Sequence, residues 1–140
     1  MRDLHKLENY CYRFDTLRSS MNDEIMTLMH QCEKLSSAFD IVESGKYKTY
    51  TTEKQKHFCD LTLARLKDFE CLATKVKVGI DTLILINNRI KTMADKFGLT
   101  EILQVEFNDY FLNCISETLK VEEQNKEFKE KLLQIQKELA

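Results

Sequence analysis

The chain contains no proline and only three glycines among its 140 residues. Proline breaks a helix interior because it has no amide hydrogen to donate, and glycine often ends a helix in a left-handed conformation. A chain with so few of these residues has little that would interrupt long helices. Gly45 and Gly98 each follow an apolar periodic segment, at the point where a helix would end.

Long apolar runs are also missing. Lys77 and Asp81 interrupt the most apolar stretch, so no segment is suited to span a membrane. The first residues carry charges at Arg2, Asp3 and Lys6 and lack the apolar core of a signal peptide. An arginine at position 2 also excludes N-myristoylation.

The five cysteines, an odd number, lie mainly at apolar repeat positions. Such positions suit reduced thiols that pack in a core, rather than a framework of disulfide bonds. Reduced thiols indicate a reducing compartment. We therefore expect an intracellular protein, in the cytoplasm or the nucleus.

Side chains that could carry catalysis are scattered along the chain. His5, His30 and His57 are far apart in the sequence. Cys32 and Cys59 each follow a histidine by two residues, but side chains two residues apart point in different directions on a helix. No nucleophile motif, phosphate-binding loop or dinucleotide fingerprint occurs. We expect no enzyme activity, no metal site, no cofactor and no small-molecule substrate.

What the chain does contain is an apolar repeat of seven residues with 3-4 spacing. This spacing places every repeat position on one stripe of a helix, and so long a stripe must be buried against other helices. In the first segment only Arg18 interrupts the repeat. Its positions are Leu4, Leu7, Cys11, Phe14, Arg18, Met21, Ile25, Leu28, Cys32, Leu35, Phe39 and Val42.

The same repeat continues through two further segments, and it predicts helices near 3–44, 52–97 and 100–139. Thr52 and Gln55 are spaced as in a capping box, and Thr100 is a candidate N-cap. The β-branched stretch 76–86 would also suit a strand, but the repeat runs through it and favours a helix. We predict one domain, residues 1–140, that is all-α and forms an elongated antiparallel three-helix bundle or coiled coil.

Charge differs between the three segments. Residues 1–44 carry 5 basic and 8 acidic side chains, residues 45–98 carry 11 and 6, and residues 99–140 carry 5 and 9. A basic helix between two acidic ones suits a bundle in which the second helix packs against both others, because complementary charges favour correct pairing. The alternative is that the basic helix binds an acidic partner protein.

Arg18 is a polar residue at a repeat position. If short turns join the helices, Arg18 lies level with Gly79 and Thr118, and the missing side chain of Gly79 would make room for it. Polar residues at such positions fix the register of helices at some cost in stability. The alternative is that the long side chain of Arg18 extends to solvent.

Asn87, Thr118 and Asn125 are the other polar residues to which we assign a register-setting role. Asn87 would lie level with Tyr10 and Tyr110, which could satisfy its amide; alternatively it lies at the edge of the bundle. Thr118 and Asn125 share one row of repeat positions in the third segment. We expect that row to face a groove used for register or for a partner, rather than the driest part of the core.

The second segment carries more apolar residues than one buried stripe needs. Large apolar patches on soluble proteins usually mark interaction sites. Lys77 and Lys91 flank this surplus as rim charges flank a docking patch. We predict that another chain covers an apolar belt made of Leu72, Val78, Ile84, Leu85 and Ile86.

Short pieces of the second and third segments resemble a known family. ATKV at 73–76, FKEK at 128–131 and IQKEL at 135–139 are similar, also in their separation, to parts of the N-terminal three-helix domain of syntaxins. The resemblance covers these pieces alone, and the fusion helix and membrane tail of a syntaxin are missing. It implies a regulatory role in trafficking, while coiled-coil subunits of kinetochore, microtubule-associated and tethering complexes fit the same pattern.

The sequence therefore predicts a non-catalytic helical adaptor or subunit of a multiprotein complex, which recognises a helical partner through apolar surfaces. Trafficking, tethering and cytoskeletal or kinetochore assembly are the candidate processes. Two alternatives remain open: a membrane-surface or nucleic-acid-binding module that uses the basic second helix, and a structural homo-oligomer. The net charge of −2 and the lack of a continuous basic face disfavour nucleic acid as a partner.

Overall fold

The computed structural model describes residues 2–99 and 109–140. Three long helices, α1 (Arg2–Glu43), α2 (Thr52–Lys96) and α3 (Asp109–Leu139), follow one another, with a short 3₁₀ helix, η1 (Lys46–Thr49), between the first two. No strand occurs in the described ranges, and 76–86 is helical throughout. The predicted all-α class and three-helix bundle are confirmed, whereas the predicted start of the third helix at residue 100 lies outside the described residues.

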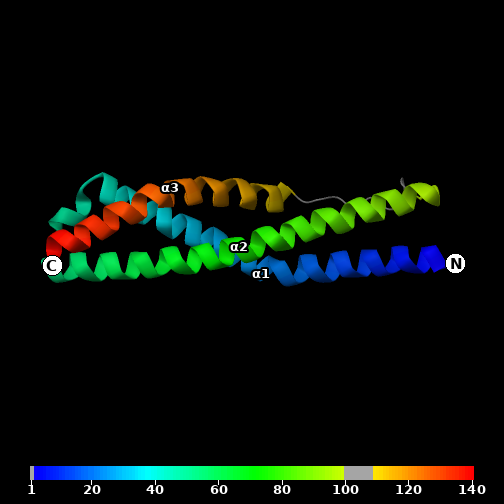
Figure 1. Cartoon of the computed structure of the whole chain (residues 1–140), viewed down its shortest axis with the longest axis horizontal. Helices are drawn as coiled ribbons and strands as arrows, with labels where there is room; N and C mark the ends of the chain where they lie inside the picture. Colours follow the sequence, from blue (N-terminus) through cyan, green and yellow to red (C-terminus); the bar gives the residue numbers. More distant parts are fainter. Residues whose placement is uncertain (1, 100–108) are drawn as a thin grey trace.

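The bundle is an elongated rod in which α2 runs antiparallel to both α1 and α3 (Figure 1). The helices α1 and α2 cross near the middle of the rod, and α3 lies along the half that contains the α1–α2 turn. A helix of 42 residues is roughly 63 Å long at about 1.5 Å per residue. The N-terminus and the C-terminus lie at opposite ends of the rod (Figure 1).

Helix α1 ends where the sequence predicted, at a glycine in the left-handed region. Gly45 has φ of 75°, and its amide donates to the carbonyl of Val42 at 3.1 Å. The predicted cap of α2 is displaced by one residue, because the hydroxyl of Thr51, not Thr52, accepts from the amide of Lys54 at 3.3 Å. Gln55 does reach back, but its side-chain amide donates to the carbonyl of Tyr50 at 2.9 Å.

Helix α2 ends in a Schellman motif around Gly98. Gly98 has φ of 64°, which favours glycine, and its amide donates to the carbonyl of Asp95 at 3.2 Å. The amide of Leu99 then donates to the carbonyl of Ala94 at 2.9 Å. These two bonds satisfy carbonyl groups that the end of the helix would otherwise leave without donors.

The apolar repeat forms a continuous core between the helices. Most repeat positions away from the ends are buried, and Cys11, Arg18 and Phe39 are half-buried. Leu4 and Phe97, near the ends of α1 and α2, are exposed by more than a third. Phe39 of α1 meets Phe128 of α3 edge to face, with ring centroids 5.4 Å apart. The largest fully buried side chains come from all three helices and include Phe14, Ile25, Leu28, Phe69, Ile80, Leu83, Phe111, Phe128 and Leu132.

The predicted neighbours of Arg18 are wrong. Gly79 lies opposite Met21, because a Cβ added at Gly79 would lie 2.7 Å from both the sulfur and the terminal methyl of that methionine. Arg18 is half-buried, with its guanidinium 5.9 Å from the centre of the Phe14 ring. Thr118 interacts with Cys32, which lies about four turns beyond Arg18 along α1.

The displacement of α3 has a physical reason. The expected level of Thr118 assumed a tight turn directly after Gly98. The contact of Phe39 with Phe128, and that of Cys32 with Thr118, instead place α3 further toward the C-terminal end of α1. Packing of large core side chains, rather than the shortest possible connection, sets this register.

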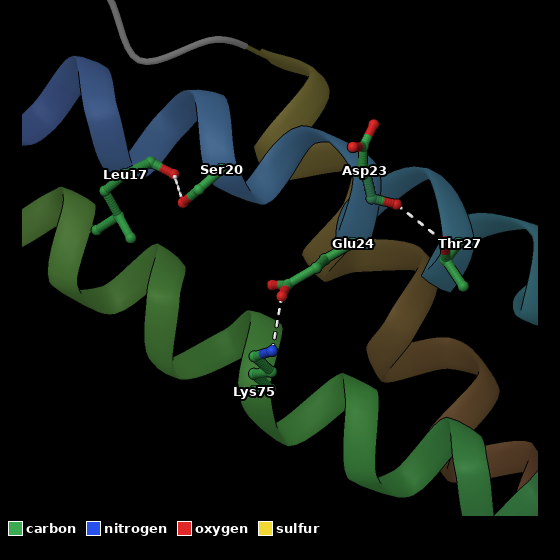
Figure 2. A network of polar contacts seen from close by, with 6 residues as sticks. All are labelled: Leu17, Ser20, Asp23, Glu24, Thr27 and Lys75. Atoms are coloured by element: carbon green, nitrogen blue, oxygen red, sulfur yellow. Dashed lines mark hydrogen bonds and ion pairs between the residues drawn. The ribbon is translucent and has the colours of Figure 1, made fainter.

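Charge complementarity between the helices follows the predicted pattern. Lys75 of the basic helix α2 pairs with Glu24 of α1 at 2.7 Å, as Figure 2 shows. Lys77 of α2 pairs with Glu122 of α3, also at 2.7 Å. Surface ion pairs contribute only about 0–1 kcal/mol each, so these pairs bear on the choice of neighbour more than on stability.

The position of Met21 generates a test of the core register. Alanine is about 1 kcal/mol better than glycine in a helix interior, but at position 79 its methyl would collide with Met21. We expect Gly79→Ala to be more favourable by about 1 kcal/mol in a Met21→Ala chain than in the wild type, as measured by urea unfolding. In an Arg18→Ala chain it should behave as in the wild type. Equal effects in all three chains would contradict this register.

Candidate functional site

Helix α2 carries apolar side chains on the side away from the core. Val78 and Leu85 are one heptad apart, opposite the buried stripe, and 60% and 54% of their surfaces are exposed. Ile84 lies between them in sequence and is 38% exposed. These three residues, which we call the outer face, are the part of the predicted belt that the bundle leaves open to solvent.

Two residues of the predicted belt are not on this face. Ile86 is only 5% exposed and belongs to the core, because it lies on the same side of the helix as the buried repeat positions Leu83 and Ile90. Leu72, two heptads earlier at the same heptad position, is half-buried and packs against the core. The prediction that Ile86 lies on a surface available to another chain is therefore wrong.

A small groove borders the outer face. Leu85 lines it together with Tyr10 of α1 and with Arg89 and Met93 of α2, and its volume is about 270 Å³. The guanidinium of Arg89 donates to the hydroxyl of Tyr10 at 3.3 Å, which ties α1 to α2 at the rim. The site thus offers apolar surface beside a hydrogen-bonding edge, an arrangement common in protein interfaces.

Helix α3 has exposed leucines that the sequence analysis overlooked. Leu112, Leu119 and Leu133 are each about half exposed. They share one heptad position, and Lys126 is the third member of this series, between Leu119 and Leu133. Their spacing by multiples of seven residues could have identified them from the sequence, but only the buried stripe and the second segment were searched for apolar repeats.

The buried polar residues differ in how well they are satisfied. The Thr118 hydroxyl lies 4.0 Å from the thiol of Cys114 and also interacts with Cys32. Asn87 is buried, yet its carbonyl oxygen accepts no hydrogen bond from the described residues. The expectation that Tyr10 satisfies this amide is not met: the oxygen of Asn87 has no partner, and the Tyr10 hydroxyl accepts from Arg89.

Asn125 is the least satisfied of these residues. Its surface is 6% exposed, and neither its carbonyl oxygen nor its amide nitrogen has a hydrogen-bond partner among residues 2–99 and 109–140. It lines a groove between α2 and α3 with a volume of about 360 Å³. We call this the α2–α3 groove, and its lining residues are Phe69, Glu70, Thr74, Glu122, Asn125, Lys126 and Lys129.

Three of the cysteines are buried in the core, and all five are free. The pKa of the Cys32 thiol is raised to about 11, chiefly by burial and also by the neighbouring Cys114, while the hydrogen bond with Thr118 lowers it. Burial likewise raises the pKa of Cys114. A thiol with a raised pKa is a poor nucleophile at neutral pH, so these side chains act in packing.

The arrangement of ionisable groups does not point to catalysis. Within the described ranges, no three side chains of histidine, cysteine, aspartate or glutamate converge to hold a metal ion. His5 and His30 are exposed, and each lies beside a glutamate on its own helix. None of the helices in this part of the chain has the length and apolarity needed to cross a bilayer.

The basic character of α2 is partly used inside the bundle, since Lys75 and Lys77 pair with acidic residues of α1 and α3. The lysines around the α1–α2 turn remain exposed, and the ammonium group of Lys54 lies 4.2 Å from the centre of the Tyr50 ring. That contact is a cation–π interaction. It fixes a surface lysine locally and does not create a continuous basic face.

Asn125 generates a stability prediction. An unsatisfied buried polar group costs about 1–3 kcal/mol, and leucine fills a similar volume without that cost. We expect Asn125→Leu to raise the free energy of unfolding by about 1–3 kcal/mol and to loosen partner or oligomer specificity. Chemical denaturation at low protein concentration measures the first effect. Thr118→Val is the matched control and should gain less, because Thr118 already has partners. A loss of stability in Asn125→Leu would refute the assignment.

Cys32 generates a pH prediction. The folded state holds the thiol proton more tightly than the unfolded state, so stability is lost as pH rises from the ordinary pKa of 9.0 toward about 11. We expect the wild type to lose about 1–2 kcal/mol more than Cys32→Val over this range, in urea titrations under reducing conditions. Cys71 is exposed and supplies the control: the stability of Cys71→Val should change with pH as that of the wild type does. Identical pH profiles for the wild type and Cys32→Val would contradict this assignment.

Comparisons of the chain with models of protein families, with curated proteins and with solved structures find no match. A proposal about function therefore draws on the exposure, charge and hydrogen bonding of the described side chains.

Proposed function

We propose that the protein is a non-catalytic helical adaptor or complex subunit that binds a helical partner protein through the outer face of α2. The exposure of Val78 and Leu85, opposite the buried stripe, carries this proposal. A solvent-facing heptad position is normally polar, because an apolar side chain there gains nothing from the fold of the single chain. Two branched apolar residues one heptad apart have the spacing at which a docked helix makes its contacts.

The outer face supplies apolar surface for a partner to bury. Burying a side chain such as Leu85 stabilises a complex by about 1.5–3 kcal/mol. The adjoining groove, lined by Tyr10 and Arg89, provides room for a side chain of the partner and polar groups at its rim. A few such anchors carry most of the affinity in typical interfaces.

The proposed setting is a reducing intracellular compartment, in the cytoplasm or nucleus, because five free thiols would be at risk of oxidation elsewhere. Within that setting we propose trafficking, tethering, or cytoskeletal or kinetochore assembly as the process. All of these use helical bundles as spacers and docking platforms.

The rival function is binding to a membrane surface or nucleic acid through basic residues. The ion pairs of Lys75 and Lys77 count against it, because those charges are compensated within the bundle. Co-sedimentation with anionic liposomes and with DNA at several salt concentrations tests the rival directly. Salt-sensitive co-sedimentation that survives changes in the outer face would favour it.

Leu85→Asp tests the proposed function. We expect it to weaken partner capture about tenfold or more, since a charge would replace an anchor worth about 1.5–3 kcal/mol. Helix content by circular dichroism should stay the same, and the free energy of unfolding should change by less than about 0.5 kcal/mol, because Leu85 is exposed. The measurement is affinity capture from the native source with tagged wild type and variant in parallel.

Ala64→Asp is the matched control. Ala64 occupies the same heptad position three heptads earlier on α2 and is also exposed. A partner retained by the wild type and by Ala64→Asp but lost by Leu85→Asp supports the proposal. A capture profile that is the same for all three chains sinks it, and so does unfolding of Leu85→Asp.

A further inference from the structure

The groove beside the outer face of α2 has a positive rim that the bundle does not neutralise. Its lining contains one charged side chain, Arg89, and no acidic one. The guanidinium carbons of Arg89 and of Arg13 on α1 each lie 5.9 Å from the centre of the Tyr10 ring. Cation–π contacts therefore hold two positive charges around one tyrosine of the groove.

Neither arginine forms an ion pair with any residue in the ranges 2–99 and 109–140. Their own helices offer no acidic neighbour, because the positions three and four residues before and after each of them hold no aspartate or glutamate. Arg89 donates to the Tyr10 hydroxyl at 3.3 Å, but a phenol is neutral at pH 7 and does not compensate the charge. Both guanidinium groups belong to exposed residues, so their charges are open to a binding partner.

The same helix contact is neutralised two heptads away. Lys75 occupies the heptad position of Arg89, fourteen residues earlier on α2, and pairs with Glu24 of α1 at 2.7 Å (Figure 2). Tyr10 lies fourteen residues before Glu24 on the antiparallel helix α1, and it takes the equivalent place opposite Arg89. The contact that provides a carboxylate at Lys75 provides only a neutral ring at Arg89. A carboxylate from another chain would supply the missing charge.

We propose that the helix bound at the outer face is acidic, and that its carboxylates pair with Arg89 and Arg13 while its apolar side chains cover Leu85 and Val78. This inference rests on the proposed function, because it names the chemistry of the partner at the same site. A guanidinium group carries a planar fork of N–H donors that fits a carboxylate with two hydrogen bonds. Arg89 uses one of its donors on Tyr10 and has others left for the partner.

The spacing on α2 defines the pattern that the partner needs. Arg89 follows Leu85 by four residues, so the two side chains lie one turn apart on the same side of the helix. Val78 precedes Leu85 by one heptad. A helix that lies along this face therefore needs apolar residues one heptad apart, with an acidic residue about one turn from an apolar one.

An acidic helix fits this surface better than a membrane or a nucleic acid does. Phosphate groups also bind guanidinium forks, but Asp81 is exposed on α2 four residues before Leu85. A continuous anionic surface would be repelled by this carboxylate. A helix can instead place a neutral or basic residue opposite Asp81 and an acidic one opposite Arg89.

Three synthetic peptides test the charge preference. Each carries leucines one heptad apart and is kept helical by a hydrocarbon staple on its opposite face. The positions four before and four after each leucine hold glutamate in the first peptide, glutamine in the second and lysine in the third. We expect the full chain to bind the glutamate peptide about tenfold or more tightly than the lysine peptide, as measured by fluorescence anisotropy. Equal affinities for the three peptides, or no binding of any of them, overturn the inference.

Charge reversal at position 89 identifies the residue responsible. Arg89→Glu should remove the preference for the glutamate peptide or reverse it. Arg89 is exposed and glutamate is a comparable helix former, so the variant should keep its fold. Lys67→Glu is the matched control: it reverses a charge at an exposed position of α2 about three heptads away and should bind all three peptides as the wild type does. An Arg89→Glu chain that keeps the wild-type preference contradicts the inference.

Leu85→Asp separates a failure of this inference from a failure of the proposed function. We expect it to weaken binding of the uncharged glutamine peptide about tenfold, because the loss then comes from the apolar contact. Binding that depends on Leu85 but shows no charge preference overturns this inference and leaves the proposed function in place. Affinities that Leu85→Asp leaves unchanged contradict both.

The other possible occupants of the site are tested with the same variants. Vesicles of phosphatidylcholine and phosphatidylserine, or DNA, that bind the wild type but not Arg89→Glu would identify phosphate groups as the occupant and overturn the inference. Self-association of the chain that Arg89→Glu abolishes, in sedimentation equilibrium, would identify a second copy and overturn it as well. We expect the wild type and Arg89→Glu to behave alike in all three assays.

Discussion

The rod depends on the burial of one apolar stripe on each helix against the stripes of its neighbours. The helix propensity of the individual residues does not keep such a helix folded alone in water. Burial along the repeat supplies the stability, and large side chains such as Phe39 and Phe128 set how far each helix is displaced along the others. Ion pairs such as Lys75 with Glu24 lie outside this stripe and act on neighbour choice (Figure 2).

The seven-residue repeat was sufficient to predict the helices and their buried faces because it depends only on local spacing. The level of Thr118 was not predictable in the same way. Moving α3 along the rod by whole heptads keeps its own apolar positions turned toward the stripes of α1 and α2, so periodicity does not distinguish one such register from another. The choice rests on side-chain shape, as in the contact of Phe39 with Phe128. Periodicity also does not decide between Thr51 and Thr52 as the N-cap of α2, since either hydroxyl suits the sequence pattern; in the structure Thr51 is the cap.

The candidate surfaces were predictable to the same limited extent. Val78 and Leu85 lie opposite the stripe on any helical wheel, and they are exposed. Ile86 lies on the flank of the stripe, and whether a flanking residue is buried depends on which neighbour lies beside it. The sequence shows that Asn125 is a polar residue at a repeat position. It does not show that both polar atoms of the amide lack partners among the described residues, because this depends on the surrounding side chains.

The position of the two termini has a mechanical consequence. Because the N-terminus and the C-terminus lie at opposite ends of the rod, tension applied between them pulls α1 and α3 in opposite directions along the axis (Figure 1). That is shear, which loads the whole length of the helix contacts at once. A hairpin of two helices held by its ends would instead be opened one turn at a time, under a smaller force. A pull along the rod is therefore resisted by the contacts of α1 and α3 together rather than one turn at a time.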